Sequence, residues 1–300
     1  MSDSDIVYWN RETDSLETEK VYGEFWLKFI YNNPLGKIGL WAIVKRAWFS
    51  HWYGKKMNGS QSAEKIVPFI KKYGLEMDDF LDSVDSFNSF NEFFYRKLKS
   101  SARPINQDQD SVVFPADGRH LVIPNLNKKS FIYAKGQKFE LPQLLGDSKL
   151  AKDFEEGAMV ISRLCPVDYH RFHFPCEGTV KSTHLINGAL SSVSPIALRK
   201  NLSIFCQNKR YLTVVENKEI GTFLQLMIGA TCVGSVHWTS QVGRHYQKGD
   251  EQGYFSFGGF CVITIFPPNT LRFDADITDN SHNGIEAYAK VGNRLGSFDL

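Results

Sequence analysis

Short apolar runs separated by polar clusters fill the chain from about residue 111 onward. Runs such as Ala158–Arg163 and Phe223–Ile228 are rich in apolar residues and are divided by Asn, Gly, Lys and Pro, which is typical of strands joined by turns. Ser111–Phe114 and Tyr211–Glu216 follow the same pattern. No strand-helix alternation accompanies them, so the pattern predicts a mostly antiparallel β domain over 106–300.

The preceding residues, 21–105, have a helical pattern. Glu64–Tyr73 is followed by Gly74, which fits a glycine at a helix C-terminus. Ser89 and Glu92 match a capping box opening a helix over Phe90–Lys99. Residues 1–20 are polar and are expected to form a loosely ordered tail. The fold class predicted is therefore α+β, with a helical N-terminal third followed by a β domain.

Residues 21–56 carry ten aromatic side chains, six Lys or Arg and one Glu, a net charge of +5. Asn32-Asn33-Pro34 divides the segment into two helical pieces. Such a segment suits either an interfacial membrane helix or a helix pair packed on the core, and the two are compatible. The longest apolar run, Ile38–Val44, has seven residues, against the roughly 20 that span a bilayer.

Composition excludes several other classes of protein. The 300 residues have a net charge of only +2, so no nucleic-acid partner is expected. Five cysteines without a C-x-x-C pair argue against a disulfide framework or a zinc knuckle and suit a reducing compartment. The acidic N-terminus lacks a signal-peptide core. We expect a peripheral protein on the cytoplasmic side of an anionic membrane surface.

Two stretches contain candidate acid-base residues. Asp117 lies in a Pro/Gly turn, Phe114-Pro-Ala-Asp-Gly118, and taken alone this is an ordinary Asx-type turn. His170 and His173 lie in Arg163–Pro175 among arginines and aromatic residues. A catalytic histidine and a surface polar cluster both fit this stretch. The H-x-x-H spacing has no third ligand, so no metal site is predicted.

A third stretch, Lys248–Phe266, is a strand pattern interrupted by Gly258 and Gly259. A glycine pair inside a strand marks a bulge, a tight turn or a close backbone approach. The bulky Phe260 follows directly.

Together and in this order, these stretches resemble the phosphatidylserine decarboxylases. The resemblance runs from about Leu27 to the C-terminus and implies the family's α+β fold. It rests on Phe93-Phe-Tyr-Arg-Lys-Leu-Lys with Ala102-Arg-Pro-Ile, Pro115-Ala-Asp-Gly, Lys135-Gly, Asp168-Tyr-His-Arg-Phe-His-Phe-Pro, Val233-Gly-Ser and Lys248-Gly-Asp-Glu-Gln-Gly-Tyr-Phe.

The resemblance implies a proenzyme that cuts itself. In this family a serine after the glycines attacks the preceding carbonyl, and β-elimination leaves a pyruvoyl group that acts as electron sink for decarboxylation. By the same resemblance, Asp117 and His173 belong to a self-cleavage triad, and His170 assists decarboxylation.

The chain departs from the family at the cleavage motif, Gly-Gly-Ser-Thr or a near variant. Here the corresponding residues are Gly258-Gly259-Phe260-Cys261, and a phenyl ring supplies neither a nucleophile nor a β-leaving group. Cys261 could attack in principle, but it is one residue out of register and in a strand faces the opposite side. Cleavage at Ser297 would release only a four-residue fragment.

We therefore expect a phosphatidylserine decarboxylase homologue that does not self-cleave and forms no pyruvoyl group. It would bind phosphatidylserine, or a partner subunit in a homo- or hetero-oligomer with an intact homologue. The alternative is an active pyruvoyl-dependent decarboxylase that matures through Cys261 or another nucleophile. No metal is expected in either case.

Overall fold

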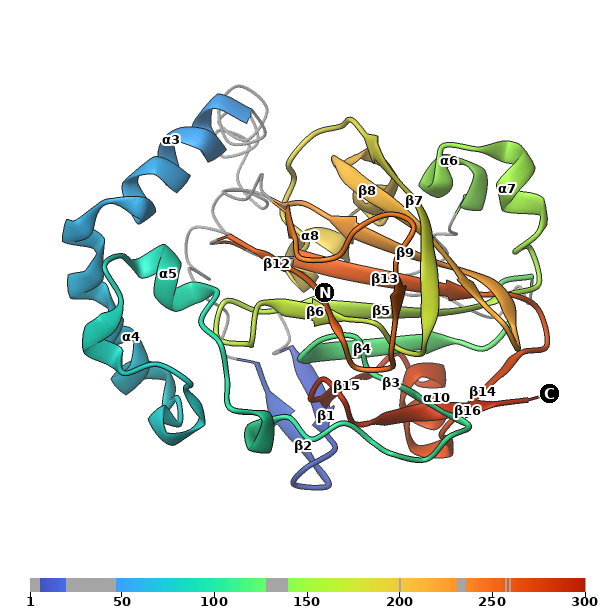
Figure 1. Ribbon diagram of the computed structural model, residues 1–300, viewed down its shortest axis with the longest axis horizontal. Helices are drawn as coiled ribbons and strands as arrows, with labels where there is room; N and C mark the ends of the chain where they lie inside the picture. Colours follow the sequence, from blue (N-terminus) through green and yellow to red (C-terminus); the bar gives the residue numbers. More distant parts are fainter. Residues whose placement is uncertain are drawn as a thin grey trace.

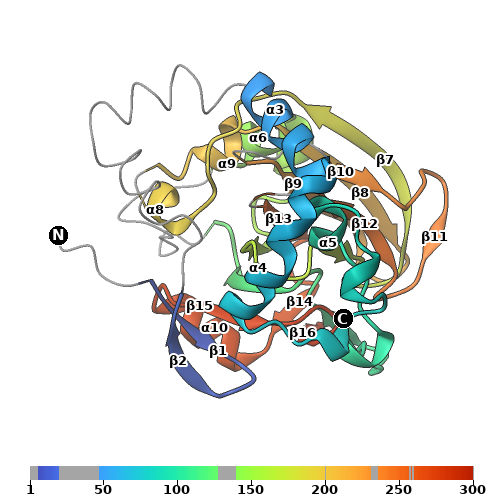
Figure 2. The ribbon, with the colours of Figure 1, turned by 90° about the vertical axis from the view of Figure 1, so that its left-hand side faces the viewer.

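The computed structural model describes residues 6–19, 47–127, 140–199, 201–230, 236–256, 258 and 260–299, with the backbone alone for 47–51. Figures 1 and 2 show a large β body with the helices α3, α4 and α5 to one side of it. Helices and extensive, mostly antiparallel strands confirm the predicted α+β class.

The main sheet of the β body has ten strands, and its neighbours are antiparallel except for the first strand of the chain, which runs parallel to β15. In spatial order they are β11 (His245–Tyr246), β7 (Gly178–Ile186), β8 (Arg210–Asn217), β9 (Gly221–Ile228), β13 (Phe260–Phe266), β5 (Ala158–Leu164), β4 (Gly118–Ile123), β15 (Glu286–Ala289), β1 (Val7–Asn10) and β2 (Ser15–Thr18). The central β13 pairs with β5 and β9, so its side chains are buried on both faces.

Two three-stranded sheets complete the β body. One has the order β10 (Val236–Trp238), β12 (Glu251–Phe255), β6 (Arg171–His173), and the other β14 (Leu271–Phe273), β16 (Arg294–Phe298), β3 (Ser111–Val113). The short helices of this part are α6 (Leu141–Leu145), α7 (Ser148–Lys152), α8 (Pro195–Leu198), α9 (Ile204–Gln207) and α10 (Ala275–His282).

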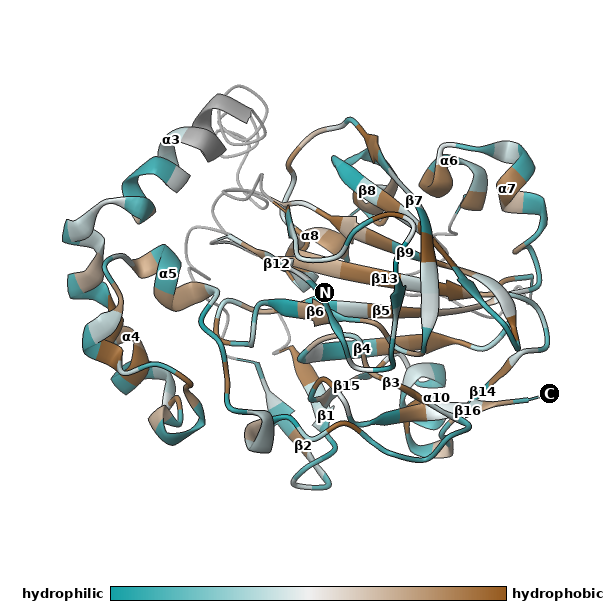
Figure 3. Cartoon of the chain, viewed as in Figure 1, coloured by the Kyte–Doolittle hydropathy of each residue, from teal (hydrophilic) through white to brown (hydrophobic). Residues whose placement is uncertain are grey.

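The core of the β body lies on both faces of the main sheet. On one face, residues from α6, α7, α8 and α9 pack against Leu212, Leu226 and Ile263. On the other face, α10 and the β14-β16-β3 sheet pack against Val160 and Phe223. Figure 3 shows the corresponding hydrophobic segments along β5 and β13. This double burial explains why these strands have nearly continuous apolar sequences.

The helical region has a small core of its own. It consists of α3 (Ala47–Asn58), α4 (Ile66–Tyr73), α5 (Phe90–Phe94) and the 3-10 turns η2 (Ser60–Lys65), η3 (Met77–Asp79), η4 (Val84–Ser86) and η5 (Ser100–Ala102). Its buried side chains include Met57, Phe69, Phe80 and Phe93. Among the residues described, no helix is long and apolar enough to cross a bilayer.

Several predicted boundaries are confirmed. Gly74 ends α4 in the left-handed conformation, with φ 64°. The Ser89 hydroxyl accepts a hydrogen bond from the Glu92 backbone N–H at 3.2 Å and so caps α5. The predicted strands all occur, with ends shifted by one or two residues. Lys135 and Gly136, which belong to one of the quoted motifs, lie outside the described residues.

Two predictions are wrong. Residues 7–18 are not a loose tail: β1 and β2 form a hairpin that extends the main sheet, because Ile6–Trp9 is itself a short strand sequence. The helix opened by Ser89 ends at Phe94 rather than Lys99, since Leu98 pairs instead with Phe80. Of the helical pieces expected over 21–56, residues 20–46 lie outside the described part, and 47–58 belong to α3.

Candidate functional site

The glycine pair lies where the chain passes from one sheet to another. β12 ends at Phe255 in the small β10-β12-β6 sheet, and β13 begins at Phe260 in the main sheet. Gly258 has φ 145°, a conformation that favours glycine. Phe257 and Gly259 lie outside the described residues. The interruption in the sequence pattern is therefore a change of sheet.

Phe260, the residue expected at the cleavage position, is fully buried. Its ring stacks on Phe255 with centroids 3.7 Å apart and an interplanar angle of 16°. The ring also meets His170 edge-on, with centroids 6.3 Å apart. A bulky residue directly after the glycines is therefore explained by packing, because Phe260 fills a small aromatic and apolar cluster.

His170 precedes β6 and is enclosed by aromatic rings, with Phe94 of α5 at 3.8 Å between centroids. Its Nδ1 lies 2.9 Å from the Asp168 carbonyl oxygen. Because a carbonyl only accepts, Nδ1 carries the proton and Nε2 is left as the basic nitrogen. Burial lowers the pKa of His170 to about 3, although the backbone groups of Asp168 and Gly258 act in the other direction.

His173, at the end of β6, has the same arrangement. Its Nδ1 donates to the carbonyl oxygen of Gly249 at 2.9 Å, and burial lowers its pKa. The Nε2 atoms of both histidines are buried without a hydrogen bond of ordinary geometry to any described residue. Each histidine is therefore neutral at pH 7. Neutrality is what a general base requires, but a pKa of about 3 makes the buried His170 ring a weak base.

Asp117 lies at the start of β4 and is 1% exposed. Arg103 donates to both oxygens of the Asp117 carboxylate. Its Nε lies 3.0 Å from Oδ1 and 2.9 Å from Oδ2, and its Nη2 lies 2.6 Å from Oδ2. The Val291 backbone N–H also donates to it at 2.9 Å. Next to it, a Cβ at Gly118 would lie 2.5 Å from the Arg163 carbonyl oxygen, so only glycine permits this approach of β4 to β5.

The structure thus brings some of the expected site residues together and joins others only indirectly. His170 and Phe260 touch, and Gly258 adjoins His170. Asp117 and His173 hydrogen-bond to other groups rather than to each other, although the His173 N–H binds the carbonyl of nearby Pro115 at 2.7 Å. The triad roles of Asp117 and His173 stay a prediction.

Cys261 faces away from this cluster. It is fully buried in the core on the opposite face of β13, with Ile263 and Ile265. Burial raises the pKa of its thiol far above the usual range, so the thiolate, which is the nucleophilic form, is suppressed.

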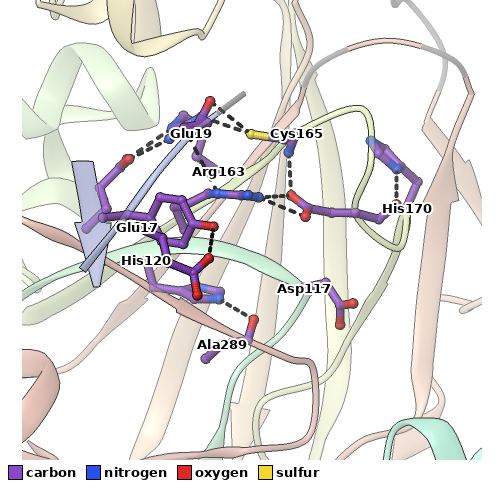
Figure 4. A network of polar contacts seen from close by, with 12 residues as sticks. Glu17, Glu19, Asp117, His120, Arg163, Cys165, His170 and Ala289 are labelled. Atoms are coloured by element: carbon purple, nitrogen blue, oxygen red, sulfur yellow. Dashed lines mark hydrogen bonds and ion pairs between the residues drawn. The ribbon is translucent and has the colours of Figure 1, made fainter. Parts of the chain in front are cut away.

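A buried ion-pair network adjoins His170 (Figure 4). Arg163 binds Glu19 at 2.6 Å and Glu286 at 2.5 Å, while Arg119 binds Asp168 at 2.7 Å. Although burial acts to raise it, the charges of Arg163 and Arg119 lower the pKa of Glu19 to about 2. The network ties the N-terminal hairpin to β5 and fixes the turn that carries His170.

A cleft of about 330 Å³ lies between the helical region and the β body, lined by residues that include Arg96, Arg103, Asp117, Asp168 and Tyr288. Arg96 and Arg103 fall within the quoted motifs, but no role was predicted for them. The sequence signal for Arg96 is its place directly after three aromatic residues, Phe93 to Tyr95. No cluster of His, Cys, Asp and Glu suited to a metal occurs in the part of the chain described.

Comparison with known proteins identifies the family. The family model described as phosphatidylserine decarboxylase matches residues 90–297. The chain belongs to the phosphatidylserine decarboxylase family. Proteins described as phosphatidylserine decarboxylase proenzymes are similar over nearly their whole length: that of Fusobacterium nucleatum is 41% identical over 97% of both chains, and that of Clostridium kluyveri 42% identical over 97% of this chain and 98% of its own. The Chlamydia muridarum proenzyme is 42% identical over 99% and 98%.

The pyruvoyl group of this family can be tested against the residues present. Its formation needs an oxygen or sulfur on the β-carbon of the residue after the glycines. Phe260 carries a phenyl ring there, and that ring occupies the space against Phe255 and His170. The side chain at position 260 therefore does not fit the formation of the group.

Proposed function

We propose that this chain is a phosphatidylserine decarboxylase homologue that does not self-cleave and does not decarboxylate, and that it retains ligand binding. The observation that carries the proposal is the place of the Phe260 ring, which stacks on Phe255 and meets His170 edge-on. A phenyl group in that place has no atom that can attack a carbonyl. It also keeps water and substrate from the His170 ring.

The rest of the site favours loss of one side chain over general decay. His170 and His173 both hold their Nδ1 proton on a carbonyl and leave Nε2 basic. Asp117 is buried in a well-formed pair with Arg103. A fold that had drifted freely would not be expected to keep three buried polar side chains so completely oriented, because buried polar groups cost free energy unless they are held.

The alternative function, an active decarboxylase maturing through Cys261, is less well supported. The thiol lies on the wrong face of β13 for the bond preceding residue 260, and its raised pKa suppresses the thiolate. Reaching that bond would require β13 to turn over between its partners β5 and β9.

The mass of the purified, unmodified chain tests the proposal. We expect one species of 34.2 kDa, no adduct with a carbonyl reagent such as a hydrazide, and no CO₂ release from phosphatidylserine. A chain split next to residue 260 with a reactive carbonyl would show an active enzyme and overturn the proposal. Degradation elsewhere would yield fragments without that carbonyl.

We also propose that the helical region attaches the protein to an anionic membrane surface, where it would meet phosphatidylserine. Support comes from exposed hydrophobic side chains at 52–81, of which Trp52 is 55% exposed. Lys56 lies 5.8 Å from the Trp52 ring and Lys55 is adjacent. Basic residues near such a surface contribute about 1 kcal/mol each, and Trp favours the headgroup boundary.

Point variants test this attachment better than deletion of residues 1–56, because deletion would also remove the β1–β2 hairpin and Glu19. Trp52→Glu combined with Lys55→Glu should reduce flotation with vesicles containing phosphatidylserine. Val242→Glu is the matched control, since Val242 is 59% exposed on the β body. Equal loss in both variants would contradict the proposal. If neither variant changes flotation and the chain co-purifies with an intact homologue, the exposed surface binds a partner subunit instead of a membrane.

A further inference from the structure

The cleft between the helical region and the β body contains an unbalanced buried charge. Most charged side chains along it pair with one another: Arg103 with Asp117 and Asp79, Arg119 with Asp168, and Lys290 with Glu12. Among the described residues that line the cleft, Glu76 and Arg96 form no ion pair. Glu76 is exposed, whereas Arg96 is buried.

Arg96 is only 6% exposed. Its Nε is buried without a hydrogen-bond partner in the described part of the chain, and one terminal nitrogen makes a single long bond, 3.4 Å, to the Phe93 carbonyl. The guanidinium lies 4.9 Å from the Phe80 ring and 4.8 Å from the Phe93 ring. The two rings contact the guanidinium through cation–π interactions, but they accept no ordinary hydrogen bonds from its N–H groups.

A buried guanidinium with unused donors is costly unless an anion completes it. Burial lowers the pKa of Arg96 to about 10, while the neighbouring acids Asp117 and Asp168 act in the other direction. The group therefore remains charged at pH 7. A planar guanidinium presents paired donors that match the oxygens of a phosphate or carboxylate.

We propose that Arg96 binds the phosphate of a small ligand in this cleft, and that the ligand also carries an ammonium group. The exposed carboxylate of Glu76 on the same walls, which pairs with no described residue, gives a cation a place beside the anion held by Arg96. A serine phosphodiester headgroup has this combination of charges, and so the proposal rests on the retained ligand binding proposed above. Inorganic phosphate shares the anionic part of this chemistry alone.

Titration calorimetry of the uncleaved chain with glycerophosphoserine and with inorganic phosphate tests the proposal. Arg96→Met keeps the apolar stem and removes the charge, so we expect its affinity for glycerophosphoserine to fall at least about tenfold, the scale of one charge-assisted hydrogen bond. Arg272→Met is the matched control, because Arg272 is an exposed surface cation paired with Asp299. It should bind as the unmodified chain does.

Tighter binding of glycerophosphoserine than of phosphate supports a headgroup, and equal binding supports a phosphate site alone. Unchanged affinity in Arg96→Met, or no heat with either probe at about 10 mM, near the weakest measurable affinity, would overturn the proposal. If Arg96→Met fails to fold, Glu76→Trp replaces it: Glu76 is exposed at the cleft, and its indole should block binding. Undiminished binding there would overturn the proposal equally.

These outcomes are separable from those of the proposed function. The mass of the same sample reports whether the chain has been cut, whereas the titration reports Arg96. A cleaved chain that binds through Arg96 would refute the first proposal and keep the second. An intact chain that binds neither probe would keep the proposed loss of self-cleavage and refute the proposed binding at Arg96.

Discussion

Phe260 and Cys261 are consecutive residues whose side chains lie on opposite faces of β13. Phe260 packs with Phe255 beside His170, and Cys261 packs with Ile263 in the main core. This follows from the two-residue period of a strand. Phe260 thus lies beside His170 but carries an unreactive ring. Cys261 carries a reactive sulfur but lies on the face of β13 away from His170.

Replacing Phe260 with Ser should restore self-cleavage, because His170, His173 and Gly258 lie around the start of β13. We expect fragments of about 29 and 5 kDa from the 34.2 kDa chain. Denaturing electrophoresis and fragment mass measure the result. The smaller fragment should react with a hydrazide.

Phe260→Ala is the control for that experiment. Both replacements empty the same aromatic site and should cost about 3–5 kcal/mol of unfolding free energy. They differ only in the hydroxyl. Cleavage in both variants would show that another nucleophile acts once the ring is gone, and cleavage in neither, with both folded, would show that positioning around residue 260 has been lost as well.

Cys261→Ala should leave the mass of the chain and its lack of carbonyl reactivity unchanged. The thiol lies in the core, so the expected effect is a loss of roughly 1–2 kcal/mol in unfolding free energy, the scale of one or two buried methylene groups. Urea unfolding and intact mass measure the two quantities. An unmodified chain that is cut, and a Cys261→Ala chain that is not, would establish the alternative function.

The sequence predicted what depends on local pattern. The strand runs, the Gly74 C-terminus and the Ser89 cap follow from hydrophobic periodicity and capping chemistry, and each occurs. The opposite orientation of Phe260 and Cys261 also followed from strand geometry alone. The change of sheet at Gly258 did not, because a turn between sheets and a bulge within one strand share the same glycine signal.

Long-range pairing could not be predicted from pattern. Glu19 lies in a polar stretch that was interpreted as a tail, yet it pairs with Arg163, 144 positions away. Asp117 was assigned by resemblance to a triad, and nothing local indicated its grip by Arg103. Such pairs depend on which strands become neighbours, and that information is not contained in either segment by itself.

Glu19→Gln should destabilise the protein strongly. It removes the charge that pairs with Arg163 at 2.6 Å in a buried site, and breaking a buried pair costs about 3–5 kcal/mol. Since Glu286 still binds Arg163, we expect the lower end of this range. Glu17→Gln, on the same hairpin but little buried, should cost about 1 kcal/mol or less.

The loss of unfolding free energy caused by Glu19→Gln should also depend on pH. The folded pKa of Glu19 is lowered to about 2, below the unfolded value near 4.3. Its contribution is therefore complete above the unfolded pKa and is lost as pH falls through about 2. Urea unfolding at pH 7 and pH 3 should give a smaller difference between variant and unmodified protein at pH 3. A constant difference would contradict the pairing.

The buried histidines should make the whole fold acid-sensitive at a higher pH. Burial lowers the pKa of His120 and of His170 to about 3 each, against about 6.5 when unfolded. Between these values the unfolded chain binds more protons than the folded one, so stability is complete above pH 6.5 and falls as pH drops toward 3. Each such histidine contributes a slope of up to about 1.4 kcal/mol per pH unit.

His120→Gln isolates one of these contributions. His120 lies away from the glycine turn, with Nε2 donating to the Ala289 carbonyl at 3.2 Å and Nδ1 accepting from the Ser162 hydroxyl at 2.9 Å. The variant should be less stable at pH 7 yet lose stability less steeply between pH 6 and pH 4, because one buried group no longer takes up a proton on unfolding. His184→Gln, at an exposed position on β7, is the control and should keep the original slope. Equal slopes in all three proteins, measured by urea unfolding across this range, would mean that His120 is already protonated in the folded state, and its Nδ1 would then donate to the Ser162 hydroxyl instead of accepting from it.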